Sequence, residues 1–152
     1  MKAAALVVTA LLGCVTVGAQ SATAPSRIVS LVPALTEMLF DIGAGNRVVG
    51  VSRFDAFPVE VRSLPRVGGL IDPDYEAILR LSPDLVVTYG SQTELERRLR
   101  LANIRYYSYR HAGVAGVLQT VRELGLATQR PQQGEAAASR LQQQLDRVAS
   151  AV

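Results

Sequence analysis

The stretch of residues 27–89 places the strongest limit on how this chain can fold. Short runs rich in valine and isoleucine alternate there with stretches in which apolar residues recur every three or four positions. The first pattern is typical of buried strands, and the second is typical of amphipathic helices. Strands that alternate with helices form a parallel sheet covered on both faces. We therefore predict an α/β fold with a parallel, Rossmann-like sheet flanked by helices.

The expected elements follow from these periods and from the Pro, Gly, Ser and Asp residues between them. Predicted strands cover residues 28–32, 48–51, 85–88 and 104–109, and predicted helices cover 33–42, 73–81, 91–102, 114–126 and 131–152. Asp72 is expected to cap the second helix, with Pro73 at its first position. Ser91 and Glu94 have the spacing of a capping box, and Gly125 is expected to end the fourth helix.

The N-terminus has the pattern of a secretory signal peptide over residues 1–19. A positive Lys2 precedes the apolar residues 3–12, and Val17-Gly18-Ala19 fits a signal-peptidase site. Residues 20–26 would then form a short tether. The sequence around Cys14 loosely matches a lipoprotein processing site, where the cysteine would carry a lipid. The apolar residues after Cys14 favour the ordinary signal peptide and leave a mature chain without cysteine.

Charge and motifs exclude several function classes. The formal net charge is only +3 and the arginines are scattered, which argues against a nucleic-acid partner. The pair Gly43 and Gly45 follows a predicted helix and precedes a strand, the reverse of a dinucleotide-binding turn. His111 is the only histidine, so no cofactor and no metal site are expected. A small exported α/β enzyme stays open as an alternative. It would need a nucleophile or a paired acid and base at the strand ends, where the carboxylates are Glu37, Asp55, Asp72 and Asp74.

Ligands of parallel sheets bind beyond the carboxyl ends of the strands. The residues that follow the predicted strands are therefore the candidates, at 33–37, 52–57, 69–72, 89–91 and 110–111. Phe54 and Tyr89 fall in these segments, and flat rings there suit a large, partly apolar ligand. Arg53 is a candidate polar contact. We therefore predict a protein that holds a ligand and catalyses no reaction.

The last predicted helix is long for a chain of this size. Between residues 131 and 152 it has no interior breaker, and apolar residues recur along one side: Ala137, Leu141, Leu145, Val148 and Val152. A helix of about 20 residues spans about 30 Å. Such a stripe indicates that another structure packs beside the helix. An interaction module that pairs through this helix is therefore a second alternative.

Two segments carry a family resemblance, RIVSLVPALTEMLFDIGAGNRVVGVSRFDAFP and PRVGGLIDPDYEAILRLSPDLVV. They resemble the N-terminal lobe of periplasmic substrate-binding proteins of ABC importers, in the subgroup that binds cobalamin, iron-siderophores, haem and related metal chelates. That resemblance implies two α/β lobes joined by one long helix, with the ligand between them. It divides this chain into the N-terminal lobe at 27–130 and the connecting helix at 131–152, with the second lobe absent.

Several residue roles follow from the resemblance. Phe54 stands where cobalamin binders place an aromatic against the corrin, and Leu70 stands where they place a tryptophan. Glu76 matches an acidic residue that docks on arginines of the membrane permease. Together with Arg53, the expected ligand contacts are Pro33, Ala34, Thr36, Phe54, Leu70 and Tyr89. The chain is expected in the periplasm, with an ABC permease of the inner membrane as its partner and weak or absent ligand binding on its own.

Overall fold

The computed structural model describes residues 23–151 of the 152-residue chain. The predicted signal peptide at 1–19 and the lipid attachment considered at Cys14 lie outside the described residues, as do 20–22 of the tether and Val152. No helix among residues 23–151 is both long and apolar enough to cross a membrane.

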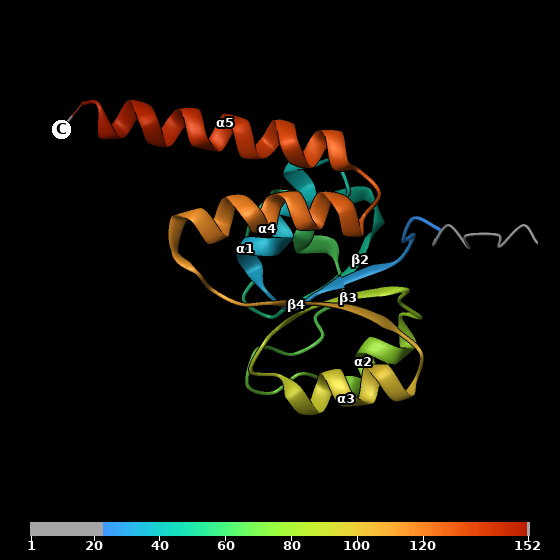
Figure 1. The fold of residues 1–152 in the computed structure, drawn as a ribbon. Coiled ribbons are helices and arrows are strands. Elements are labelled where there is room, and N and C mark those ends of the chain that lie inside the picture. The colour runs from blue at the N-terminus through green and yellow to red at the C-terminus, as the bar shows by residue number, and fades with distance from the viewer. Residues whose placement is uncertain (1–22, 152) are drawn as a thin grey trace, which may run out of the picture.

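The described strands form one parallel sheet in the order β2-β1-β3-β4 (Figure 1). Their bounds are β1 (Ile28–Ser30), β2 (Val48–Val51), β3 (Leu85–Tyr89) and β4 (Arg105–Tyr109). The first strand is shorter than predicted because Val32 already accepts the first backbone bonds of the following helix. The α/β class and the parallel sheet are confirmed.

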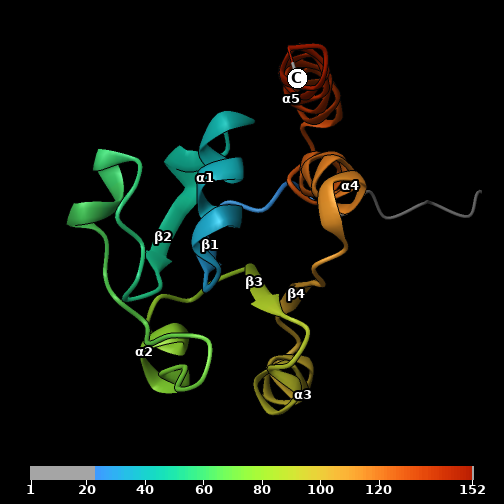
Figure 2. The same ribbon diagram turned by 90° about the vertical axis from the view of Figure 1, so that its left-hand side faces the viewer.

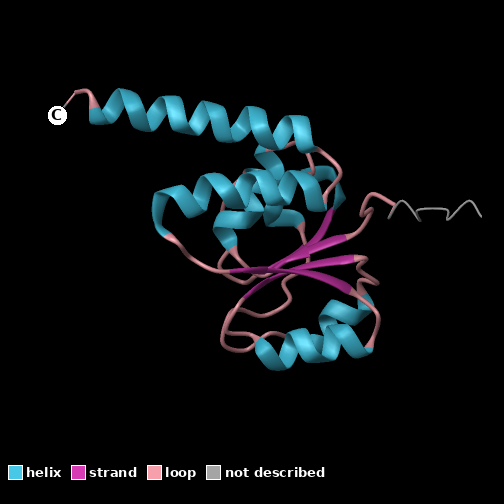
Figure 3. Cartoon of the chain, in the orientation of Figure 1, coloured by secondary structure: helices cyan, strands magenta, loops and turns pink. Residues whose placement is uncertain are grey.

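Helices cover both faces of the sheet, as Figure 3 shows. On one face lie α1 (Pro33–Asp41) and α4 (Gly113–Ala127), and on the other lie α2 (Tyr75–Arg80) and α3 (Thr93–Leu101). The long α5 (Pro131–Ala149) packs outside α4 as a further layer. Short 3₁₀ turns, η1 (Gly45–Arg47) and η2 (Val59–Ser63), flank β2.

Each face of the sheet has its own apolar core, because successive side chains of a strand point to opposite sides. Ile28 and Val87 pack with the residues of α1 and α4, whereas Val29 and Val86 pack with those of α2 and α3. All four are fully buried. Burial on both sides explains why the two inner strands, β1 and β3, are mostly apolar.

The sheet has a topological switch point between β1 and β3. The chain leaves β1 for β2 on one side, and β3 then pairs with β1 on the other side. Ligand crevices of open α/β sheets form outside the carboxyl ends of the strands at such a point. Figure 2 views the molecule from this side, which we call the carboxyl edge.

Two glycines let α4 and α5 approach closely. A Cβ on Gly134 would lie 3.0 Å from the Cα of Gly125, so neither position has room for a side chain. Gly125 was predicted to end α4, and this was wrong: it lies inside the helix and forms the contact with α5.

The first half of α5 is packed, and its second half is largely open to solvent. Ala137 is buried, Leu141 and Leu145 are half-buried, and Val148 is 64% exposed. The C-terminal turns project past the other elements on the side of the carboxyl edge (Figure 1). The predicted helix is therefore present, and its apolar stripe is only partly covered.

Candidate ligand-binding site

The loop after β2 holds Phe54 at the carboxyl edge. The buried hydroxyl of Ser52 accepts a hydrogen bond from the Phe54 backbone N–H at 3.2 Å and donates one to the Asp55 carboxylate at 2.5 Å. The Arg66 guanidinium donates to the backbone carbonyls of Ser52 and Asp55 at 3.0 and 2.9 Å. These bonds fix the loop backbone, while the Phe54 ring remains 66% exposed.

A second loop, before α2, lies against this ring. The backbone N–H of Arg53 donates to the Gly68 carbonyl at 2.7 Å, which joins the two loops. Gly69 has no side chain where the Phe54 ring passes; a Cβ there would meet the ring edge at 2.8 Å. The next residue, Leu70, is 40% exposed. The structure thus brings Phe54 and Leu70 together, although they are far apart in sequence.

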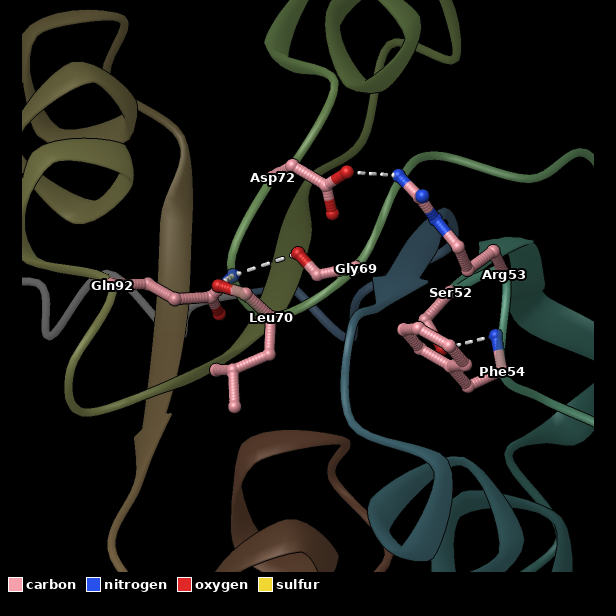
Figure 4. Close-up of polar contacts among 7 residues, drawn as sticks. All are labelled: Ser52, Arg53, Phe54, Gly69, Leu70, Asp72 and Gln92. Carbon is pink, nitrogen blue, oxygen red and sulfur yellow. Dashed lines mark hydrogen bonds and ion pairs between the residues drawn. The ribbon is translucent and has the colours of Figure 1, made fainter.

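The side chain of Gln92 links this loop to the end of β3. Its Oε1 accepts a hydrogen bond from the Tyr89 backbone N–H at 2.9 Å. Its Nε2 donates to the carbonyls of Leu70 at 3.1 Å and Gly69 at 3.4 Å (Figure 4). Gln92 is 6% exposed. The sequence did not indicate this residue, because two of its three partners lie 22 and 23 positions away.

The predicted capping box of α3 is wrong. Gln92 occupies the N-cap position and makes no side-chain cap bond. Glu94 instead binds Arg97 and Arg98 at 2.8 and 2.9 Å. Hydrogen bonds from these two guanidinium groups lower the pKa of Glu94 to about 2.

An ion pair joins the two loops beside Phe54. The Arg53 Nη2 lies 2.5 Å from the Asp72 Oδ2, and the guanidinium carbon lies 5.9 Å from the centroid of the Phe54 ring (Figure 4). Asp72 was predicted to cap α2, and this was wrong. Asp74 is the N-cap, and its carboxylate accepts the Ala77 N–H at 2.9 Å. Asp72 is free to pair because Asp74 makes the cap.

Aromatic side chains continue the edge beyond β3. The rings of Tyr89 and Tyr109 meet edge to face with centroids 5.6 Å apart. The Tyr109 hydroxyl and the Nδ1 of His111 are 2.9 Å apart and share a hydrogen bond. Tyr89 is half-buried and His111 is exposed. This half of the edge therefore offers ring surface as well as polar groups.

The start of α1 places its three candidate residues differently. Pro33 is half-buried and Ala34 is exposed, so both reach the surface. Thr36 is fully buried, and its hydroxyl donates to the Ser30 hydroxyl at 2.8 Å. The structure therefore does not bring Thr36 to the ligand surface; its hydroxyl ties α1 to β1.

The carboxylates considered for an enzyme alternative have separate structural roles. Asp55 is buried against Ser52, Asp72 pairs with Arg53, and Asp74 caps α2. Glu37 is exposed on α1. Within residues 23–151, no three His, Cys, Asp or Glu side chains gather as a metal-binding group.

Glu76 lies in the first turn of α2, away from these loops. Its side chain is exposed and forms no hydrogen bond or ion pair within the described part of the chain. A groove of about 510 Å³ begins beside this helix and runs between the loop at 70–73 and the start of α3. Its walls include Leu70, Ile71, Tyr75 and Gln92.

Comparison with known proteins decides the family. The sequence profile of a family described as "Periplasmic binding protein" matches residues 28–152. This chain belongs to the periplasmic binding protein family. The resemblance predicted from residues 27–89 is thereby confirmed. Members of this family are non-enzymatic substrate-binding proteins. The prediction of a protein without catalytic activity is therefore confirmed, and the enzyme alternative was wrong.

Curated relatives of this periplasmic binding protein are about twice its length. The vitamin B12-binding protein of Pectobacterium carotovorum is 30% identical over 126 residues, which are 82% of this chain and 46% of the relative. That of Vibrio campbellii is 28% identical over 122 residues, 79% of this chain and 44% of the relative. The chain thus spans about half the length of the curated relatives it matches.

Solved structures show the same lobe. The periplasmic vitamin B12-binding protein of Vibrio cholerae superposes with a TM-score of 0.75 at 26% identity, over 83% of this chain and 50% of that one. A periplasmic haem-binding protein from Pseudomonas aeruginosa superposes with a TM-score of 0.77 at 26% identity, over 83% and 46%. Both structures are 26% identical to this chain, so sequence identity does not distinguish a vitamin B12 ligand from a haem ligand.

Proposed function

We propose that this protein is the substrate-binding component of an ABC import system. It captures a metal chelate such as cobalamin, haem or an iron-siderophore in the periplasm and delivers it to the permease in the inner membrane. The main support is the exposure of Phe54 and Leu70 on two loops that contact each other at the carboxyl edge. Buried apolar side chains are the rule in such a fold, and an exposed ring beside an exposed leucine suits a ligand.

The same proposal gives roles to the remaining segments. Residues 1–19 direct export, residues 27–130 form one wall of the ligand cleft, and the helix at 131–152 connects it to a second wall. Glu76 is the contact for arginines of the permease, since its exposed carboxylate lacks a partner among residues 23–151. Its place on α2 leaves Phe54 and Leu70 free for the chelate.

One observation favours a second candidate function, an interaction module that pairs through α5. The apolar side chains of this helix are left partly uncovered, and Val148 is 64% exposed. In that case the uncovered stripe would bind another chain rather than lead to a second lobe.

Nuclear magnetic resonance of residues 20–152 tests the first proposal. Cyanocobalamin and gallium-substituted haem and siderophore are suitable diamagnetic probes. At least one of them should shift the backbone amide signals of Phe54, Leu70 and Tyr89. The amide of Leu101, exposed on α3 away from the edge, is the internal control.

The affinity should be weak, because one lobe provides only half of the contacts that enclose a ligand. We expect a Kd well above about 1 μM. Micromolar or tighter binding of cobalamin in calorimetry would contradict the need for a second wall. Shifts confined to other parts of the chain would contradict the site itself.

A further inference from the structure

The ion pair between Arg53 and Asp72 joins the two loops that carry two expected ligand contacts, Phe54 and Leu70 (Figure 4). Both charged side chains are accessible, with exposed fractions of 48% and 61%. The guanidinium also lies 5.9 Å from the Phe54 ring centroid. Any ligand that covers this ring therefore meets the pair as well.

Asp72 weakens the electrostatic attraction that Arg53 exerts on an anionic ligand. A lone guanidinium attracts anionic groups, and its attraction falls only as the inverse of distance. With the Asp72 carboxylate in contact, an approaching anion is attracted by one charge and repelled by the other. The net interaction becomes that of a small dipole. The surface around Phe54 is thus close to electrically neutral.

We propose that Asp72 is a specificity-determining residue that makes this part of the site favour chelates of low net charge over strongly anionic ones. The inference rests on the proposed function and adds a ligand class to it. Asp72 acts by compensating Arg53, whereas Phe54 and Leu70 provide the apolar contact.

Neighbouring charges do not replace this compensation. Arg66 is turned to the carbonyls of Ser52 and Asp55, and Asp74 is engaged at the start of α2. Arg110 packs over Gly90 at the end of β3 and forms no ion pair within the described residues. Arg110 follows β4 and is separated from the loop after β2 by β1 and β3, so it acts on the other end of the edge.

A ligand anion could replace Asp72 as the partner of Arg53, because exposed ion pairs contribute little free energy. Asp72 would nevertheless stay close. Its loop is held by the Gln92 bonds to Gly69 and Leu70 and by the Arg53 N–H bond to Gly68. The carboxylate therefore continues to repel the anion after the pair has opened, and the selection against anionic chelates persists.

The substitution Asp72→Asn tests the proposal, since it removes the charge and keeps the shape and a hydrogen-bond acceptor. Haemin serves as the anionic probe and cyanocobalamin as the probe without net charge, in equilibrium dialysis with residues 20–152 at low salt. The variant should bind haemin about tenfold more tightly and cyanocobalamin within about twofold of the unmodified chain. The gain for haemin should shrink at high ionic strength.

Asp146→Asn is the matched control, because it removes one charge from the exposed end of α5. An equal gain in this control, or haemin binding by Asp72→Asn within twofold of the unmodified chain, would overturn the proposal. Failure of both chelates and of the gallium-substituted siderophore to bind any of the three proteins would instead refute the proposed function. In that case, a titration with citrate, followed by the Nε resonance of Arg53, tests whether Asp72 compensates the charge of Arg53. Equal midpoints in the unmodified chain and in Asp72→Asn would overturn it.

Discussion

Gln92 connects two ligand-facing positions through one side chain. Replacing it by methionine keeps its length but removes the bonds to the Tyr89 N–H and to the carbonyls of Gly69 and Leu70. Because these backbone groups would lose partners in a buried place, the free energy of unfolding should fall by about 1–3 kcal/mol. Urea denaturation measures this change, and hydrogen exchange of the Tyr89 amide should accelerate.

Gln142→Met provides the control for that change. This glutamine is exposed on α5 and binds only Asp146, one turn away. Its replacement should alter the free energy of unfolding by less than about 0.5 kcal/mol. If the two variants behave alike and the Tyr89 amide exchanges at its original rate, the link through Gln92 does not hold in solution.

Among the helices, the crossing of α4 and α5 leaves no space for a side chain at Gly134. Valine there would have to push against the backbone of Gly125, so α5 must shift away from α4. We expect Gly134→Val to lower the free energy of unfolding by about 2 kcal/mol or more, as overpacking does. Ala136→Val, on the exposed side of the same helix, should cost only the small difference in helix propensity. Equal losses in urea denaturation would contradict the close crossing.

The strands and most helices could be predicted because their apolar periods are local. The helix cap of α2 could not be predicted, since Asp72 and Asp74 both flank Pro73. Their roles differ because Arg53, which is 19 residues away from Asp72, pairs with Asp72. Gly125 looked like a helix terminator for the same reason: its contact is with Gly134 of the next helix.

The candidate site was predictable in part. Phe54 and Tyr89 follow strand ends, so the rule for parallel sheets was enough to place them at the edge. The inward position of Thr36 also had a signal, because it lies on the same helical face as Leu35 and Leu39, which are fully buried. Gln92 gave no local signal, as its role depends on how two loops meet.

For the molecule as a whole, the exposed part of α5 is the surface through which the chain would associate with another chain. If α5 is a connecting helix, its C-terminal turns contact a second lobe and have no partner within this chain. Val148→Asp should therefore leave the mature chain monomeric and change its free energy of unfolding by less than about 0.5 kcal/mol. Leu141→Asp should cost several times more, because Leu141 is half-buried and lines the groove between α5 and α1. Sedimentation velocity and thermal unfolding provide the measurements. A dimer that Val148→Asp dissociates would support the interaction module instead.

The bond between the end of β3 and the loop of Leu70 is made by a carboxamide, which neither gains nor loses a proton in water at ordinary acidity. A glutamate in the place of Gln92 could accept from the Tyr89 N–H, but it could donate to the Leu70 carbonyl only when protonated. The spacing of the two loops would then follow the acidity of the surroundings. With glutamine, the separation of Leu70 and Tyr89 stays the same in acidic and neutral media, so a chelate meets an edge of constant shape.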